Sequence, residues 1–172
     1  MGKSTVSKRL AEELNGKLID LKELSRKRKI IVGYDKDNRS MLVDEKKINK
    51  IVLEKIKKER TYILDSHLAQ FVKPKNTDLL VVLRADPDII EKRLKKRGYP
   101  SRKVYDNSIC EYLDYCLIES LDLSHGKHLH EINTTKRSVK SIVNEIKSVL
   151  SKEKKRSYGN VSWLKEDDSG NN

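Results

Sequence analysis

The sequence predicts an α/β fold in which helices cover both faces of a parallel sheet. Two observations lead to this prediction. Segments with apolar residues at every third or fourth position, the helical pattern, alternate with short apolar runs. The runs at 62–64 and 79–83 are continuously apolar, as is typical of strands that are buried on both faces. At 172 residues, the chain has the length of one domain.

The composition is strongly basic. The 38 Lys and Arg residues outnumber the 26 Asp and Glu residues, and the net charge of +12 favours a polyanionic substrate or partner. The alternative is a solvated, lysine-rich surface of the kind found in thermophiles. The sequence has no apolar run of membrane-spanning length, and Cys110 and Cys116 lack the spacing of metal ligands. We therefore expect a cytoplasmic protein with free thiols and no membrane partner.

The amino end resembles the last part of a phosphate-binding loop. Gly2-Lys3-Ser4-Thr5 leads directly into a helical pattern at 4–15. Glycine lets the backbone approach a phosphate, and the N–H groups that open a helix favour an anion. Lys3 would then contact the β- and γ-phosphates of ATP, and the Ser4 hydroxyl would be a ligand of Mg²⁺. A chance occurrence of these four residues at a helix start is the alternative.

The next segment predicts a strand, a basic helix and a loop. Lys17-Leu18-Ile19-Asp20 predicts a short strand, and the very basic segment 21–29 predicts a helix. Gly, Asp and Asn are concentrated at 33–38, which predicts a polar loop rich in turns. Asp44 is a candidate cap for a second helix. The apolar positions of that helix are Ile48, Ile51, Val52 and Ile56.

The second half of the chain continues the alternation. The apolar run at 62–64 ends in Asp65, and the run at 79–83 ends in Arg84. Asp86-Pro87 combines a cap with a first-turn proline and predicts a helix start. A longer helix is then predicted, with Ile109, Leu113, Leu117 and Leu121 at four-residue spacing. A short strand at 129–133 and a last helix follow, and the apolar positions of that helix are Val139, Ile142, Val143, Ile146 and Leu150. From Ser151 the sequence predicts a polar tail in which Trp163-Leu164 docks back.

A phosphate-binding loop needs a buried strand directly before it. In doubly wound nucleotide-binding folds, this strand lies inside the sheet at the point where the ligand binds. Its loss would leave two neighbouring strands unpaired, which costs more than the ~5–15 kcal/mol that stabilises a domain. We therefore expect about a dozen further residues before Met1, carrying the first strand and the loop glycines.

Several short motifs occur in order along the chain. They are Gly2-Lys3-Ser4-Thr5, Gly33-Tyr34-Asp35, Val43-Asp44-Glu45, Leu64-Asp65-Ser66-His67, Leu83-Arg84-Ala85-Asp86, and Lys96-Arg97-Gly98-Tyr99 followed by Asn107. In this order and spacing they resemble the adenylate kinase isoenzyme 6 family, the nuclear or archaeal adenylate kinase-like ribosome factors. The resemblance runs from Gly2 to about Leu150 and departs from the family pattern in the absent first strand and loop glycines.

The resemblance implies the P-loop fold of nucleoside-monophosphate (NMP) kinases, a doubly wound parallel sheet whose first strand is missing from this chain. The kinase domain would span 1–150, with an NMP-binding insertion at 20–43 and a lid at 96–106. Residues 151–172 would be a charged tail. ATP and AMP or another NMP would be the substrates, and Mg²⁺ the cofactor.

Asp65 and His67 gain a role from the resemblance, because an Asp-x-His pair is a signature of the family. Asp65 follows a strand, where carboxylates of the Walker B type hold Mg²⁺ and its waters. His67 would position a water for ATP hydrolysis. The alternatives are a capping aspartate and a structural histidine.

Further site residues come from the segments that resemble the lid and the insertion. Arg97, with Arg93 as a second candidate, would close over ATP and neutralise charge on the transferred group. Arg26 would bind the phosphate of the acceptor, and Gly33, Tyr34 and Asp35 would shape its site. Thr134-Thr135 resembles the segment near the adenine. The alternative for Arg93 and Arg97 is a solvated helix arginine, which is the commoner case. Arg26 is equally consistent with membership of a basic surface run, and Thr134-Thr135 with a turn that leads into a helix.

The sequence thus predicts an ATP-dependent NMP kinase with ATPase activity. By resemblance, it would act in maturation of the small ribosomal subunit, with a ribosomal protein and ribosomal RNA as partners. The basic clusters would contact RNA phosphates electrostatically. The alternatives are a nucleotide-switched ribosome-assembly factor with incidental kinase activity and an inactive truncated form.

Overall fold

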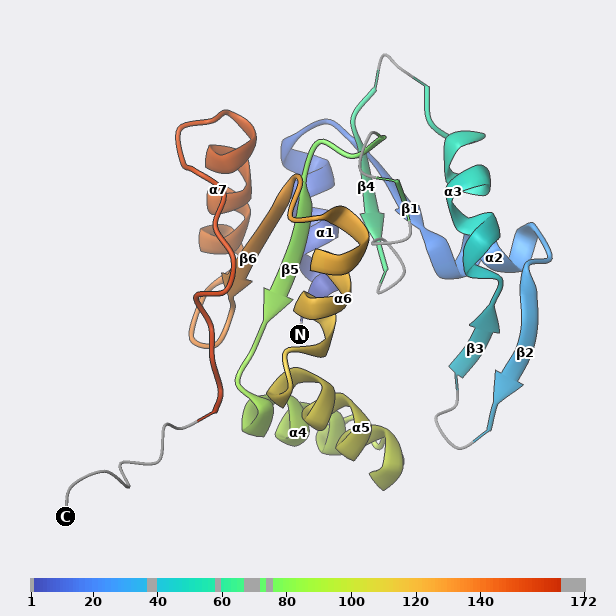
Figure 1. Ribbon diagram of the computed structural model, residues 1–172, viewed down its shortest axis with the longest axis vertical. Helices are drawn as coiled ribbons and strands as arrows, with labels where there is room; N and C mark the ends of the chain where they lie inside the picture. Colours follow the sequence, from blue (N-terminus) through green and yellow to red (C-terminus); the bar gives the residue numbers. More distant parts are fainter. Residues whose placement is uncertain (1, 37–39, 58–59, 67–71, 74–75, 165–172) are drawn as a thin grey trace.

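The computed structural model describes residues 2–36, 40–57, 60–66, 72–73 and 76–164 (Figure 1). The first three elements, a helix, a strand and a helix, follow the predicted alternation. The elements are α1 (Lys3–Glu13), β1 (Lys17–Asp20), α2 (Leu21–Lys27), β2 (Ile31–Asp35), β3 (Ser40–Val43), α3 (Glu45–Leu53), β4 (Tyr62–Asp65), β5 (Leu80–Arg84), α4 (Pro87–Lys96), α5 (Ser101–Tyr112), α6 (Tyr115–Ser124), β6 (Leu129–Asn133) and α7 (Val139–Leu150).

Within the described residues, the strands pair two by two. β1 pairs with β4 and β5 pairs with β6, both in parallel, while β2 and β3 form an antiparallel hairpin. β4, β5 and β6 run in the same direction, so their carboxyl ends lie at one edge (Figure 1). The predicted α/β class, with its parallel strands and covering helices, is confirmed.

Three groups of buried apolar side chains hold the layers together. In the largest, α1 and α7 pack side by side against β4 and β6, and Lys147 Nζ of α7 donates a hydrogen bond to Glu13 Oε2 of α1 at 2.9 Å. α6 covers the other face of β5 and β6, while α2 and α3 pack against β1. The buried residues of the largest group are Val6, Leu10, Ala11, Ile63, Ile132, Ile142, Val143 and Ile146.

The predicted loop at 33–38 is wrong over its first residues, because Ile31–Asp35 is strand β2. Its partner is β3, with Tyr34 opposite Met41 and Asp35 opposite Ser40. The side chains of this strand are poorly buried: Val32 is 68% exposed and Tyr34 is 56% exposed. A strand of this kind does not show the continuous apolar run that predicts a buried strand. Backbone pairing in the hairpin, rather than burial of side chains, stabilises β2.

The single helix expected around Ile109 to Leu121 is in fact two helices, α5 and α6. The break lies at Asp114, which has a φ of 55°. The carbonyl oxygen of Asp114 accepts the backbone N–H groups of Leu117 and Ile118, each at 2.9 Å, and so opens α6. Apolar residues keep their four-residue spacing across the break, so periodicity alone does not reveal it.

The break at Asp114 coincides with a buried ion cluster around Arg84, which is 1% exposed. Arg84 Nε donates to Glu111 Oε1 at 2.6 Å, Nη1 donates to Glu131 Oε1 at 2.6 Å, and Nη2 binds the carboxylate of Asp114. Burial lowers the pKa of Arg84, but the hydrogen bonds to Glu111 and Asp114 outweigh it, and the pKa lies above its ordinary value. The cluster joins the end of β5 to β6 and to the junction of α5 and α6.

The segment after α7 returns to the sheet. The N–H of Glu131 in β6 donates to the Ser157 carbonyl oxygen at 2.8 Å, and the N–H of Ser157 donates to His130 Nδ1 at 3.1 Å. Trp163 Nε1 donates to Glu111 Oε1 at 3.0 Å, and its ring lies 5.9 Å from the guanidinium carbon of Arg84. The predicted docking is confirmed for Trp163, whereas Leu164 is 58% exposed. We call residues 151–164 the C-terminal strap.

Glu145 of α7 anchors the beginning of the strap. Its carboxylate accepts hydrogen bonds from Arg137 and from Lys154 of the strap, and lies 3.2 Å from His130 Nε2. Burial raises the pKa of Glu145, but the bonds to Lys154 and Arg137 prevail and lower it from 4.5 to about 2. The folded protein therefore favours the ionised carboxylate.

We expect Arg84→Ala to destabilise the protein by about 3–5 kcal/mol, because it leaves buried carboxylates without a counter-charge. Urea unfolding followed by circular dichroism measures this loss. The matched control is Arg102→Ala, which removes an exposed pair with Asp106 on α5 and should cost no more than about 1 kcal/mol. Equal losses in the two variants would contradict the role of the cluster.

Glu145→Gln should destabilise the protein by about 1–3 kcal/mol near neutral pH. The ionised Glu145 contributes its full stability above its ordinary pKa of 4.5, and that contribution disappears as the pH falls toward about 2. The gap between variant and parent should therefore close over this range, as measured by urea unfolding at several pH values. Glu153→Gln, at an exposed position of the strap, is the control; a gap independent of pH would refute the assignment.

Candidate functional site

The amino end of α1 has the backbone form of a phosphate-binding turn. Gly2 has φ 62° and ψ 11°, a left-handed conformation that glycine adopts without steric cost. The N–H of Val6 donates to the Gly2 carbonyl oxygen at 3.0 Å as the helix begins. The preceding N–H groups have no acceptor within a helix, and an anion can accept from them. Ser4 and Thr5 lie in this first turn and are exposed.

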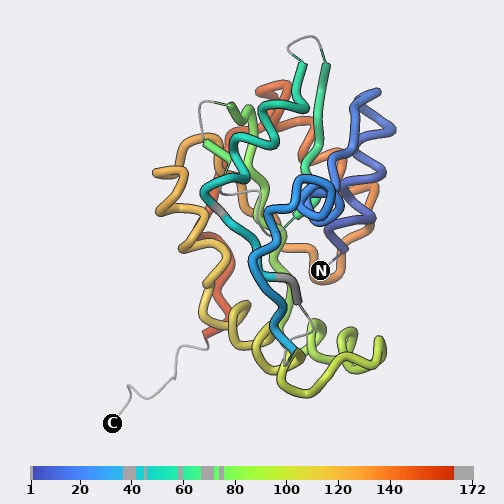
Figure 2. The backbone as a smooth tube through the Cα atoms, turned by 90° about the vertical axis from the view of Figure 1, so that its right-hand side faces the viewer, coloured from blue at the N-terminus to red at the C-terminus, as the bar shows by residue number. Residues whose placement is uncertain are grey.

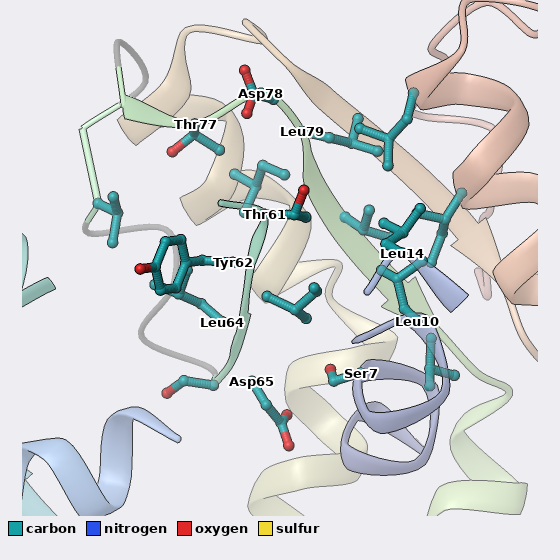
Figure 3. Close-up of a pocket in the computed structure, with 18 of the residues that line it drawn as sticks. Ser7, Leu10, Leu14, Thr61, Tyr62, Leu64, Asp65, Thr77, Asp78 and Leu79 are labelled. Atoms are coloured by element: carbon teal, nitrogen blue, oxygen red, sulfur yellow. The ribbon is translucent and has the colours of Figure 1, made fainter. Parts of the chain in front are cut away.

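Lys3 and Asp65 line the same cavity, although 62 positions separate them in the sequence. The cavity has a volume of about 620 Å³ and lies between β4 and β5, beside α1 (Figure 3). Asp65 ends β4, Ser66 follows it, and Lys3 opens α1. A lysine and a carboxylate thus line one cavity, a combination that suits a nucleotide phosphate with its metal ion.

Asp65 of the cavity lining and Ser4 in the first turn of α1 carry oxygen donors that fit a magnesium ion shared with a substrate. Mg²⁺ prefers oxygen ligands, keeps several waters, and is usually held by one or two carboxylates together with phosphate oxygens. The Ser4 hydroxyl and the Asp65 carboxylate are donors of that kind. In the part of the chain that the structure describes, no group of three or more His, Cys, Asp or Glu side chains forms a metal cage.

Asp20 is a carboxylate at the same edge that the sequence analysis did not single out. It ends β1 and lies directly opposite Asp65 in the parallel register. Its side chain accepts hydrogen bonds from the N–H groups of Lys22 and Glu23 at 2.8 and 3.1 Å, and so caps α2. The sequence does carry a signal, since the apolar runs at 17–20 and 62–65 both end in aspartate.

The proposed lid at 96–106 consists of the α4–α5 turn and the first half of α5. Arg97 is the residue after α4 and is exposed, as is Arg93 one turn earlier. In both views, the amino end of α1 lies above this helical hairpin (Figures 1 and 2). Arg97 therefore belongs to the element that faces the carboxyl edge of the sheet, but lies outside the set of described residues that line the cavity.

The proposed NMP-binding insertion at 20–43 contains α2 and the β2–β3 hairpin, which lie on the far side of β1 and β4 from β5 (Figure 1). Arg26 is exposed on α2, and Gly33, Tyr34 and Asp35 belong to β2. The described lining of the cavity does not include these residues. His67 lies outside the described residues.

Thr134 and Thr135 follow β6 and fix the end of β5. The Thr134 hydroxyl and N–H both donate to the carbonyl oxygen of Arg84, at 2.7 and 2.8 Å. Thr135 Oγ1 accepts from the N–H of Asp86 at 2.9 Å, while the Asp86 carboxylate accepts from the N–H of Asp88 at 2.8 Å as the cap of α4. The start of α4 is thereby held against the carboxyl edge.

No helix among the described residues is long and apolar enough to cross a membrane.

The sequence profile of the AAA domain family matches residues 1–114. The protein named "Putative adenylate kinase" of Methanocaldococcus jannaschii is 42% identical over 163 residues, which is 95% of this chain and 87% of that protein. Its namesakes in Methanococcus maripaludis and Thermococcus onnurineus are 37% and 34% identical, over 96% and 97% of this chain and 91% and 88% of their own lengths. The chain belongs to the AAA-domain family of P-loop proteins and, within it, to the adenylate kinase-like proteins.

Proposed function

We propose that the protein transfers the γ-phosphoryl group of ATP to a nucleoside monophosphate, with AMP as the acceptor, and hydrolyses ATP slowly when no acceptor is bound. The observation that supports the proposal is that Lys3 and Asp65 line one cavity, in a chain of the adenylate kinase-like family. The kinase domain is 1–150, with the acceptor site in 20–43 and the lid at 96–106. The described part of the 151–172 tail packs against this domain through β6 and Glu111.

The reaction is an in-line displacement. An oxygen of the acceptor phosphate attacks the γ-phosphorus, the bond from that phosphorus to the β,γ-bridging oxygen breaks, and two nucleoside diphosphates leave. Backbone N–H groups from Gly2 to Thr5 bind the phosphates of ATP, and Lys3 neutralises charge on the β- and γ-phosphates. Mg²⁺, when bound with ATP, supplies further neutralisation. Ser4 and Asp65 would hold that ion, since both carry the oxygen donors that Mg²⁺ prefers.

The flanking elements complete the site. Arg97 brings a guanidinium onto the transferred group as the lid closes and water is excluded. Arg26 binds the acceptor phosphate with its planar fork, while Gly33, Tyr34 and Asp35 border the nucleoside. His67 positions the water that is used in hydrolysis.

ADP formation from ATP, AMP and Mg²⁺ tests the proposal. Lys3→Met should lower the rate about 100-fold or more, because the charge developing on the phosphates loses its nearest cation. Lys8→Met is the matched control, since Lys8 is an exposed lysine on the same helix, and its rate should match the parent rate. A parent protein that binds ATP but forms no ADP with any NMP would overturn the kinase assignment. Equal rates in the two variants would remove Lys3 from the site.

The charge of the lid favours a second role, in assembly of the small ribosomal subunit in the cytoplasm. We infer that the protein contacts ribosomal RNA phosphates and a ribosomal protein, and that nucleotide binding switches this attachment. In this role, kinase turnover is incidental. The basic residues of α4, α5 and their connection are Lys92, Arg93, Lys95, Lys96, Arg97, Arg102 and Lys103.

Phosphate release from ATP separates the two roles. A kinase releases little phosphate and forms ADP rapidly only with AMP, whereas an assembly factor should hydrolyse ATP faster when small-subunit particles are added. Replacing Lys92, Lys95 and Lys96 by Gln should weaken attachment to the particles and reduce its salt dependence, without an equal loss of phosphoryl transfer. Attachment of the variant that equals that of the parent at every salt concentration would contradict the RNA contact.

A further inference from the structure

The C-terminal strap ends at the base of the α4–α5 hairpin. Figure 1 shows the strap running along β6 toward this base, where two of its residues form hydrogen bonds. The N–H of Asn160 donates to Glu131 Oε2 at 2.9 Å, and Trp163 Nε1 donates to Glu111 Oε1 at 3.0 Å. Both acceptors are carboxylates that also bind Arg84. The strap is therefore attached to the buried ion cluster itself.

The composition of the cluster explains why the strap docks there. Three carboxylates face the single guanidinium of Arg84, so the cluster has more acceptor sites than Arg84 has donors. The side chains of Glu111 and Glu131 are 2% and 0% exposed, which shields them from water. A buried carboxylate is stable only when hydrogen-bond donors surround it. The strap supplies two such donors, one amide N–H and one indole N–H.

Glu111 attaches the end of α5 to the end of β5. Its Oε1 atom accepts from three donors, which are Arg84 Nε at 2.6 Å, the N–H of Ala85 at 3.2 Å, and Trp163 Nε1. Ala85 lies between β5 and α4, so these bonds join both helices of the hairpin to the strand. The indole ring also lies 5.9 Å from the guanidinium carbon of Arg84, within the range of a cation–π contact. Trp163 thus completes the attachment of the hairpin base.

The length of α5 makes this attachment important for the proposed lid. α5 begins at Ser101, within the lid, and Glu111 belongs to its last turn. Because a helix rises 1.5 Å per residue, the two positions are about 15 Å apart. A rotation of about 10° at Glu111 would therefore move the Ser101 end by about 3 Å. Phosphoryl transfer tolerates less, since a misplacement of about 1 Å can cost about 100-fold in rate.

We propose that Trp163 is a positioning residue of the lid. Its indole fixes Glu111, and thereby the direction in which α5 carries the lid toward the nucleotide. The inference rests on the proposed function, in which 96–106 closes over ATP. With the strap docked, the open lid samples few directions and loses little conformational entropy when it closes. Without the indole, nucleotide binding must order a more mobile lid, so the strap raises the affinity for ATP through the lid.

Trp163→Ala tests the proposal in two measurements. Without nucleotide, amide hydrogen exchange at 106–112 should be at least about 10-fold faster than in the parent, because the end of α5 opens more often. With ATP, AMP and Mg²⁺, the KM for ATP should rise about 5-fold or more, while kcat stays within about twofold of the parent value. A loss of stability alone would lower the active fraction, and hence the apparent kcat, without raising KM. Trp163→Phe keeps an aromatic ring but loses the N–H donor, and should give intermediate values.

Tyr158→Ala is the matched control, because Tyr158 is a second aromatic residue of the strap. Its hydroxyl oxygen lies against Gly126 in the loop between α6 and β6, so closely that a Cβ atom at Gly126 would be 2.7 Å from it. This variant should leave the exchange of α5 and the KM for ATP at the parent values. Equal effects in the two alanine variants, or unchanged exchange at 106–112 in Trp163→Ala, would overturn the proposal.

The fluorescence of Trp163 gives a check that needs no turnover. Trp163 is the only tryptophan of the chain, so its emission reports on the strap alone. Coupling between two equilibria is reciprocal, so a bound nucleotide should favour the docked strap as much as the docked strap favours the nucleotide. The non-hydrolysable analogue AMP-PNP with Mg²⁺ should therefore reduce the quenching of this emission by acrylamide. Binding of AMP-PNP with unchanged quenching would contradict the inference, whereas a parent protein that binds ATP but forms no ADP with any NMP would overturn the kinase assignment alone.

Discussion

The buried charge of Arg84 is the constraint on which much of the fold depends. A guanidinium that is 1% exposed is tolerated only with counter-charges, because an unpaired buried ion costs several kcal/mol. Glu111, Glu131 and Asp114 supply these charges from α5, β6 and the α5–α6 junction. Two further features follow from this requirement, because each contributes to the same cluster. Asp114 takes its left-handed conformation at the start of α6, and Trp163 docks against Glu111.

The cluster also determines which parts of the site are fixed. The carbonyl oxygen of Arg84 is bound by Thr134, and Asp86 is bound by Thr135, so the start of α4 is held firmly at the carboxyl edge of the sheet. The proposed lid begins almost three helical turns later, at the end of α4. A hairpin that is anchored at its base and exposed at its tip can close over a nucleotide without disturbing the sheet.

Elements with a strong local signal could be predicted from the sequence. The strands predicted at 17–20 and 129–133 and the periodic segment at 139–150 coincide with β1, β6 and α7, and Asp86-Pro87 does begin a helix. The β2–β3 hairpin could not be found in this way, because backbone pairing rather than apolar burial holds it. The partners of Arg84 lie 27, 30 and 47 positions away, and only the tertiary fold brings them together. For the same reason, motif spacing suggested Lys3 and Asp65 separately, whereas their common cavity and the pairing of Asp65 with Asp20 needed the structure.

The C-terminal strap has a consequence for association between molecules. A strand at the border of a sheet exposes backbone groups that can template pairing with a neighbouring chain. In the described residues β6 pairs only with β5, and its other side receives the strap, where the Glu131 N–H donates to Ser157 and the Glu131 carboxylate accepts from the N–H of Asn160 at 2.9 Å. The strap occupies this border without forming a strand of its own, so it offers no regular ladder to the next molecule. The protein thus carries its own protection against edge-to-edge aggregation, in a segment whose composition alone resembles a disordered tail.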